Sequence, residues 1–212
     1  MLVKYPRTFH LPWSPGATSD DKILHDTKHF VGREIVVTEK MDGENTTLYH
    51  DNFHARSLDS ADHPSQHWLK NYHAGIKHLI PAGYRICGEN MYAKHSIEYS
   101  NLPAYFLVFS VWYGMICLSW DDTITFTEKL GLHLVPFVYR GIYDTRATSS
   151  ALYNWSGCPN GTLGHEGYVI RVADAFEYAD FGKSVAKYVR RGHVQTDTHW
   201  KHNEPVKNGL GR

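Results

Sequence analysis

The sequence predicts an α+β fold in which antiparallel β-sheets are flanked by helices. Short segments rich in β-branched and aromatic residues come in pairs joined by turns, as in "TTLYH" and "FHARS" on either side of Asp51-Asn52. Segments with helical periodicity lie between groups of strands, which is typical of antiparallel sheets rather than of βαβ units. The 212 residues show no internal repeat and no obvious linker, so we expect one domain over residues 1–212.

The order of the expected elements begins with an N-terminal arm. Residues 1–32 are rich in Pro, Gly, Ser and Asp and predict irregular structure, with a short helix around residues 19–30. Gly114 is expected to turn the chain from one buried strand into the short segment 115–119. From their β-branched and aromatic content, we predict strands over residues 33–40, 46–50, 53–57, 84–90, 104–112, 133–141, 167–172 and 184–190.

Helices are expected at three places. The first covers residues 63–80, with Pro64 near its first turn, and the second covers 121–131, where Gly131 ends it. A third is expected around 145–155, ahead of a Gly-rich loop at 158–167. The apolar side chains at helical spacing in the first helix are Trp68, Tyr72, Ile76 and Leu79.

Composition and cysteine usage favour a soluble cytoplasmic protein. Apolar residues make up 42% of the chain and charged residues 21%, as in ordinary globular proteins. No apolar run approaches the roughly 18 residues that a membrane span needs, and the first residues lack the apolar region of a signal peptide. The three cysteines, Cys87, Cys117 and Cys158, lie far apart and form no CxxC, so we expect free thiols in a reducing compartment.

Common metal and phosphate motifs are missing from the sequence. The 15 histidines include pairs at helical spacing, but without HExxH or a cysteine pair a zinc site is not expected. "FGKS" at 181–184 is not the end of a P-loop, because Glu177 stands where the first glycine is required. "GTLGHEG" at 161–167 is not GxGxxG, and it precedes a strand instead of following one.

The stretch "TEKMDGENT" places charged residues at the end of an apolar strand, which has a chemical explanation. A lysine amine is a nucleophile only when it is neutral, and its ordinary pKa is about 10.4. We expect burial at the strand end, or nearby cations, to lower the pKa of Lys40. Gly43 lets the backbone turn tightly and lets a ligand approach, and Asn45 supplies a neutral donor and acceptor.

The segment from Lys40 to Asn45 resembles the KxDGxN nucleotidyl-acceptor motif of the covalent nucleotidyltransferases, the superfamily of ATP-dependent DNA and RNA ligases and mRNA capping enzymes. Five further segments resemble the family's other motifs and follow in the same order. The resemblance covers residues 5 to 200. It is greatest to the phage-type RNA ligases, so a phage or bacterial source would fit. The matching residues are Arg56 in "HARS", Glu89 in "CGENMYAKHSIEY", Phe109 or its rival Phe106 in "YFLVFSVW", Glu166 in "HEGYVIR" and Lys187 in "VAKYVR".

This resemblance implies a nucleotidyltransferase (adenylation) fold of the ligase and capping-enzyme type, and an RNA ligase reaction in three displacements at phosphorus. Lys40 attacks the α-phosphate of ATP and becomes lysyl-AMP while pyrophosphate leaves. AMP then moves to the 5′-phosphate of an RNA end, and a 3′-hydroxyl attacks that activated end and releases AMP. Charge neutralisation dominates such chemistry.

The same resemblance assigns roles to the other residues. Lys187 and Arg56 are expected to neutralise phosphate oxygens, Glu89 to accept hydrogen bonds from the ribose, and Glu166 to place a Mg²⁺ or Mn²⁺ ion. The remaining expected nucleotide contacts are Phe109 stacking on adenine, Glu39 at the adenine edge through its backbone, and Asp42, Gly43 and Asn45 of the acceptor motif.

Two departures from the family bear on the RNA substrate. Only 25 residues follow Lys187, so we expect no C-terminal OB-fold and no separate RNA-binding domain. The second lysine that often follows two positions later is Val189 here. The last thirty residues carry seven basic and two acidic residues, which is either a solvated terminal segment or a phosphate-binding surface. On the second interpretation, the expected RNA-binding residues are Arg190, Arg191 and Lys201.

Other interpretations stay open at this stage. Singly, Lys40 is a surface lysine, Phe109 a core residue, and the acidic residues partners of salt bridges. A stand-alone adenylyltransferase, a DNA-nick ligase acting with a partner, and an inactive protein that binds nucleotides or RNA ends would also carry these motifs.

Overall fold

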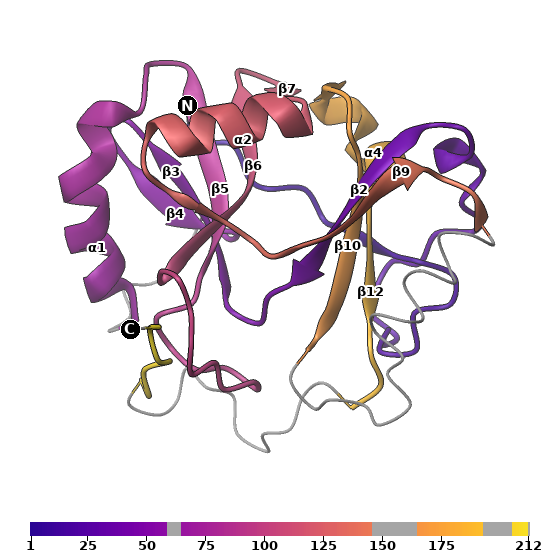
Figure 1. The fold of residues 1–212 in the computed structure, drawn as a ribbon, viewed down its shortest axis with the longest axis horizontal. Coiled ribbons are helices and arrows are strands. Elements are labelled where there is room, and N and C mark those ends of the chain that lie inside the picture. The colour runs from indigo at the N-terminus through magenta and orange to yellow at the C-terminus, as the bar shows by residue number, and fades with distance from the viewer. Residues whose placement is uncertain (59–64, 146–164, 193–204, 212) are drawn as a thin grey trace.

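The computed structural model describes residues 1–58, 65–145, 165–192 and 205–211. In these residues it has two β-sheets with helices packed around them, so the predicted α+β class is confirmed (Figure 1). The strand pairs are antiparallel except for two short ones, β1 with β12 and β6 with β8. The predicted helix at 145–155, apart from its first residue, and most of the loop at 158–167 lie outside the described residues.

The first sheet carries the strand that ends on Lys40. That strand, β2, lies inside the sheet, and five of its seven residues are buried, which explains the apolar run from Ile35 to Val37. Its register with β10 places Lys40 opposite Gly167, next to Glu166. In spatial order, the strands are β1 (Phe9–His10), β12 (Val185–Val189), β10 (Gly167–Val172), β2 (Glu34–Lys40) and β9 (Phe137–Ile142).

The second sheet begins with the predicted hairpin and continues through the strand of the aromatic motif. Its register places Asn45 opposite Glu89, so two motifs far apart in sequence become neighbours. The strands in spatial order are β11 (Phe176–Glu177), β7 (Ile116–Cys117), β6 (Phe106–Tyr113), β5 (Tyr84–Asn90), β3 (Glu44–Tyr49) and β4 (Phe53–Ala55), and β8 (His133–Leu134) pairs with β6.

Two longer helices cover the second sheet. In α2 (Trp120–Lys129), the hydroxyl of Ser119 accepts a hydrogen bond from the Asp122 backbone N–H, and the left-handed φ of 64° at Gly131 follows its end. In α1 (Ser65–Ile76), the predicted apolar residues Trp68, Tyr72 and Ile76 pack on the sheet. Leu79 does not, because the chain tightens into η2 (Lys77–Leu79) and leaves Leu79 exposed.

Two predicted elements differ from the structure, and one short helix was not predicted. The helix expected around 19–30 is only η1 (Lys28–Phe30), because residues 22–24 run beside β1 and exchange backbone hydrogen bonds with His10. The strand expected over 133–141 divides into β8 and β9, which belong to different sheets, because Pro136 has no N–H to donate. Before β12, "FGKS" forms the short helix α4 (Phe181–Ser184) after η3 (Tyr178–Asp180).

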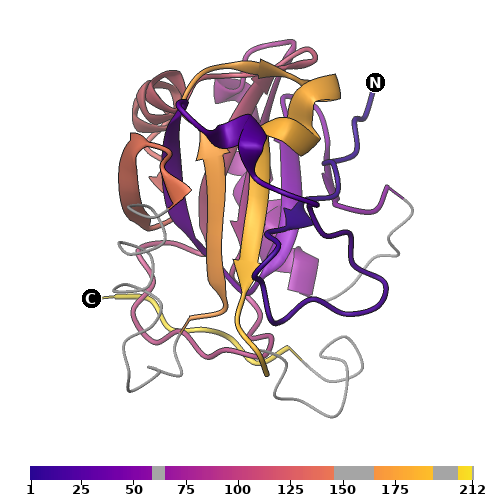
Figure 2. The same cartoon turned by 90° about the vertical axis from the view of Figure 1, so that its right-hand side faces the viewer.

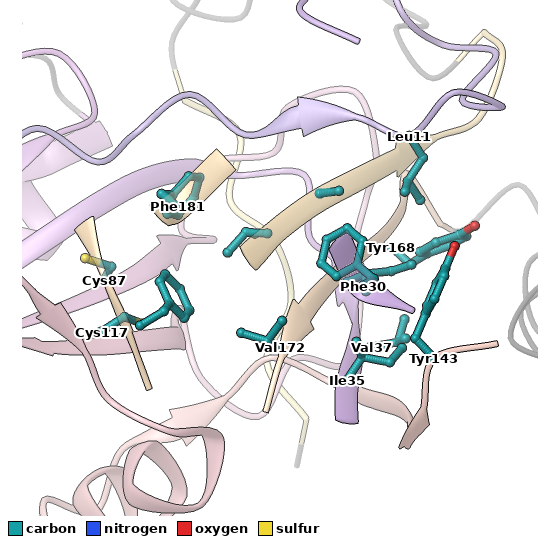
Figure 3. Packing of buried hydrophobic residues seen from close by; sticks show 14 of the residues in the cluster. Leu11, Phe30, Ile35, Val37, Cys87, Cys117, Tyr143, Tyr168, Val172 and Phe181 are labelled. Carbon is teal, nitrogen blue, oxygen red and sulfur yellow. The ribbon is translucent and has the colours of Figure 1, made fainter. Parts of the chain in front are cut away.

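A buried apolar cluster joins the two sheets. Figure 3 shows it running from Leu11, Phe30 and Tyr143 to Cys87 and Cys117, with strands of both sheets contributing. Full burial of each aliphatic or aromatic side chain of this kind stabilises the fold by about 1.5–3 kcal/mol. Within the described residues, no helix is long and apolar enough to cross a membrane.

Candidate active site

A cleft of about 460 Å³ lies between the two sheets, and most of the predicted site residues line it. Strands β2, β10 and β12 contribute from the first sheet, and β3 to β6 from the second. The predicted residues that line it are Glu39, Lys40, Gly43, Asn45, Arg56, Glu89, Phe109 and Lys187.

Lys40 lies at the end of β2 and faces a carboxylate. Its Nζ donates a hydrogen bond to Glu166 Oε2 at 2.7 Å, and its side chain is 23% exposed. Burial by itself lowers the pKa of Lys40, but the charges of Glu166, Glu89 and Asp42 outweigh burial and raise it above its ordinary value. The expected lowering is therefore wrong for the protein without nucleotide, and the amine is a protonated ammonium that must lose a proton before it can attack.

Glu89 is the most perturbed carboxyl group of the cleft. Burial raises its pKa to about 8, with the charges of Glu166 and Asp42 adding to the effect and Lys40 opposing it. Three acidic side chains thus surround one lysine. Burial and the neighbouring carboxylates therefore favour the neutral form of Glu89, and a cation bound beside it would favour the ionised form.

Asp42 anchors the turn of the acceptor motif. Its Oδ2 accepts hydrogen bonds from the backbone N–H groups of Ser96 and Ile97, both at 2.8 Å, and its own N–H donates to the Tyr99 hydroxyl. These bonds tie the acceptor motif to the segment that follows β5, so the predicted nucleotide contact of Asp42 has a structural alternative. Asn45, in contrast, lines the cleft, and its Oδ1 is buried without a hydrogen-bond partner in the described residues.

Gly43 is required by close packing rather than by its backbone angles. A Cβ at this position would lie 2.7 Å from the Asn90 carbonyl oxygen, 2.7 Å from Met91 Sδ and 2.9 Å from Glu89 Cγ. The tight approach holds the acceptor turn against β5, and so it holds Lys40 near Glu89.

Lys187 brings a second amine into the cleft from β12. Burial lowers its pKa, and so does the neighbouring charge of Lys40, while Asp21 and Glu166 act in the opposite direction. Asp21 Oδ1 lies 3.6 Å from Lys187 Nζ and 3.4 Å from His10 Nε2. The pairing of β1 with β12 sets His10 opposite Lys187 and so positions this group.

The aromatic strand resolves the choice between two phenylalanines by geometry. Side chains alternate along a strand, so Phe106 and Phe109 on β6 point to opposite faces. Phe109 lines the cleft, with the ring of Tyr5 edge-on to it at 5.2 Å between centroids. Phe106 is fully buried in the core on the other side, so of the two only Phe109 is positioned to face a bound base.

Glu39 points its carboxylate at His165. The two form a hydrogen bond of 2.7 Å between Oε1 and Nδ1, and burial raises the pKa of Glu39. Its backbone N–H is occupied by the carbonyl oxygen of Pro136 at 2.9 Å.

The predicted RNA-binding arginines lie beyond the end of β12. Arg190 donates from Nε to the His165 carbonyl at 2.6 Å and from Nη1 to the carbonyls of Arg191 and Gly192, so it holds the ends of β10 and β12 together. Arg191 is exposed, and Lys201 lies outside the described residues. Sequence reasoning missed Asp21 and Tyr5, which the N-terminal arm brings to the cleft from a segment without a recognisable motif.

A family model described as RNA ligase matches residues 33–189, well over half of the chain and the region that holds the cleft. The chain belongs to the RNA ligase family. A search of curated proteins finds no match.

Solved structures of the Naegleria gruberi RNA ligase share the fold of this RNA ligase family member. The structure with PPi has a TM-score of 0.55 at 18% identity and covers 80% of this chain and 53% of that one. A lysine-to-alanine mutant with ATP and Mn has a TM-score of 0.56 at 14% identity, with 91% and 62% covered. The chain therefore spans between about half and three-fifths of the matched structures.

Proposed function

We propose that this chain is an ATP-dependent RNA ligase that joins 5′-phosphate and 3′-hydroxyl RNA ends, and that the described residues act as its adenylyltransferase domain. The observation that carries the proposal is the position of Lys40. Its amine lies in the cleft at 2.7 Å from Glu166, with Lys187, Arg56 and Glu89 around the same space. A surface lysine with only a structural role would need no such set of charged neighbours.

In the first step, Lys40 Nζ forms a bond to the α-phosphorus of ATP, and the bond from that phosphorus to the bridging oxygen breaks. Pyrophosphate leaves with the electron pair. Glu166 Oε2 already accepts a hydrogen bond from Nζ, so it is placed to take the proton that the ammonium must lose. The cations of Lys187 and Arg56 neutralise phosphate oxygens.

The proposed reaction uses a divalent metal ion, for which we propose the carboxyl groups of Glu89 and Glu166; the described residues group no set of three or more acidic, His or Cys side chains that could hold a metal. Glu89 and Glu166 would offer the carboxylate oxygens that Mg²⁺ and Mn²⁺ prefer, and the ion would favour ionisation of the Glu89 carboxyl, whose pKa burial raises to about 8. A bound ion would neutralise charge on the phosphate oxygens. Phe109 would stack on the adenine, the backbone of Glu39 would lie at the adenine edge, and Asn45 Oδ1 would accept a hydrogen bond from the nucleotide.

In the later steps, AMP passes from Lys40 to the 5′-phosphate of RNA, and a 3′-hydroxyl then displaces AMP. Arg190, Arg191 and Lys201 remain proposed RNA contacts. We also propose a cytoplasmic location, because Cys87 and Cys117 are buried free thiols.

The test is self-labelling with α-³²P-ATP and Mg²⁺ or Mn²⁺, with α-³²P-GTP in parallel, followed by a denaturing gel. We expect label on the wild-type protein from ATP only, no label on Lys40→Ala, and normal label on Lys77→Ala, an exposed lysine of η2. A 5′-phosphorylated RNA should then chase the label and be joined. Absence of label, together with no AMP on the purified protein by mass spectrometry, would instead support a protein that binds nucleotides or RNA ends without turnover.

A further inference from the structure

A second cleft, of about 400 Å³, lies beside the active-site cleft. Its walls come from the N-terminal arm, from residue 22, and from η3 and α4. Tyr5 and Pro6 line both clefts, so the two are adjacent. Figure 2 shows the indigo N-terminal arm beside β12. The proposed reaction assigns no role to this second cleft.

The cations of the second cleft are concentrated on a protein whose formal net charge is zero. Lys4, Arg7 and Lys22 line it and are exposed, and among the described residues its lining includes no acidic side chain. Three acidic residues adjoin lining residues in sequence. Asp21 has its carboxylate engaged with Lys187, His10 and Thr18, Asp180 pairs with Lys183 at 3.3 Å, and Glu177 is exposed. The cleft is therefore a local positive surface that favours phosphate groups.

Aromatic rings lie between these cations. Phe9 is half-buried and Phe181 is buried, and Tyr178 completes the wall. The Lys22 Nζ lies 5.4 Å from the centroid of the Phe9 ring. Cations that neutralise phosphates, interleaved with rings on which bases stack, are the combination by which proteins bind single-stranded nucleic acid.

The cationic segments are held in place by backbone hydrogen bonds. The His10 N–H donates to the Lys22 carbonyl at 2.8 Å, and the Leu24 N–H donates to the His10 carbonyl at 2.8 Å. On the opposite wall, the Tyr178 hydroxyl donates to the Lys4 carbonyl at 2.8 Å. Because the arm is already ordered on the sheet, binding a strand there requires little further ordering of the protein backbone.

We propose that the second cleft binds single-stranded RNA next to the reacting end, with a base stacked on Phe9 and backbone phosphates on Arg7 and Lys22. This inference rests on the proposed function for the identity of the strand. Because Tyr5 and Pro6 line both clefts, a strand held in the second cleft would lie beside the cleft of Lys40. It places RNA on the N-terminal arm rather than only on the basic C-terminal residues.

The test measures binding of a fluorescein-labelled, 5′-phosphorylated RNA oligonucleotide to the full chain by anisotropy, without ATP, over a range of salt. The charge-reversal variant R7E/K22E is compared with K77E/K129E, which makes the same change in net charge at exposed lysines on η2 and α2. Phe9→Leu tests stacking while keeping an apolar side chain. The thermal unfolding midpoint of each variant checks folding.

We expect R7E/K22E to weaken RNA binding by at least tenfold and to lower the slope of log affinity against log salt by about 1.4. Phe9→Leu should weaken binding by about tenfold, and K77E/K129E should bind like the wild type. Equal losses in both charge-reversal variants, unchanged affinity in R7E/K22E, or no RNA binding by the wild type would each overturn the proposal. Because ATP is absent, these outcomes are independent of whether Lys40 becomes labelled.

Discussion

Asp21 and Lys187 meet across the edge of the active-site cleft, with 3.6 Å between Oδ1 and Nζ. The carboxylate comes from the irregular N-terminal arm and the amine from β12. Burial and the charge of Lys40 lower the pKa of Lys187, and the negative charge of Asp21 acts against that lowering. Asp21 is thus a positioning residue for Lys187 that no motif in the sequence indicated.

Replacing Asp21 with Asn should shift the pH dependence of self-adenylylation. Without the carboxylate the pKa of Lys187 falls further, and the ammonium that neutralises phosphate is lost at lower pH. We expect the alkaline limb of the rate profile to move to lower pH. The measurement is single-turnover labelling from pH 6 to 10, with exposed Asp20→Asn as the matched control. An unshifted alkaline limb would remove Asp21 from this role.

Glu166→Gln should slow the first step more than it weakens nucleotide binding. The amide keeps the size of the side chain but cannot accept the proton from Lys40, so the labelling rate should fall by about 100-fold or more. Glu166→Asp keeps the carboxylate and should retain part of the rate. Labelling under saturating ATP measures the effect. Equal rates for the Gln and wild-type proteins would show that another group accepts the proton.

The raised pKa of Glu89 predicts a pH-dependent stability. Between about pH 4.5 and 8, this carboxyl group is ionised in the unfolded chain and protonated in the folded one, so the unfolded state binds fewer protons and stability falls as pH rises. Glu89→Gln removes this term. Urea unfolding at pH 5 and pH 8 should show the variant gaining stability relative to the wild type at the higher pH. Glu128→Gln, exposed on α2, should show no such gain.

Gly43→Ala should disrupt the acceptor turn. The added methyl group would meet backbone and side-chain atoms of β5 and its continuation at 2.7 to 2.9 Å, and overpacking of this kind costs about 1–3 kcal/mol of folding free energy. Self-labelling should fall with it, because Lys40 is displaced. Gly75→Ala is the control, since its Cβ meets nothing within 4 Å and alanine favours the helix α1. Chemical denaturation of both variants tests the contrast, and similar stabilities would contradict it.

Substitutions of the two phenylalanines of β6 should affect different properties, ATP binding in one case and folding stability in the other. Phe109→Ala removes a ring that lines the cleft and should raise the KM for ATP about tenfold. Phe106→Ala opens a cavity in the core and should cost about 3–5 kcal/mol of stability. Steady-state labelling and urea unfolding on both variants measure the two effects. The reverse pattern would assign the base-stacking role to Phe106.

Much of the fold was predictable because its signals are local. The β-branched run of β2, the hairpin of β3 and β4, and the cap and terminal glycine of α2 all act over a few residues. The motif residues converge because each one lies in, or directly beside, a strand of the two facing sheets.

The remainder depended on contacts between distant segments. The arm pairs with β12 in parallel across more than 170 residues. Residues 22–24 in turn bond to His10 of β1, and this second pairing makes an expected helix an extended segment. The pKa of Lys40 rises because three carboxylates from separate motifs converge on it, and sequence reasoning considered burial and cations only. The charges around Lys40 come together only when the two sheets are assembled, so the direction of its pKa shift could not be predicted from the sequence.

The break at Pro136 has a mechanical consequence for the enzyme. The peptide segment at Val135 and Pro136 is bonded to both walls of the cleft, since the Val135 N–H donates to Val108 of β6 and the Pro136 carbonyl accepts from Glu39 of β2. The strand that carries Lys40 and the strand that carries Phe109 are therefore linked through this segment at one end of the cleft. One short peptide segment therefore sets the distance between the two strands at this end of the cleft.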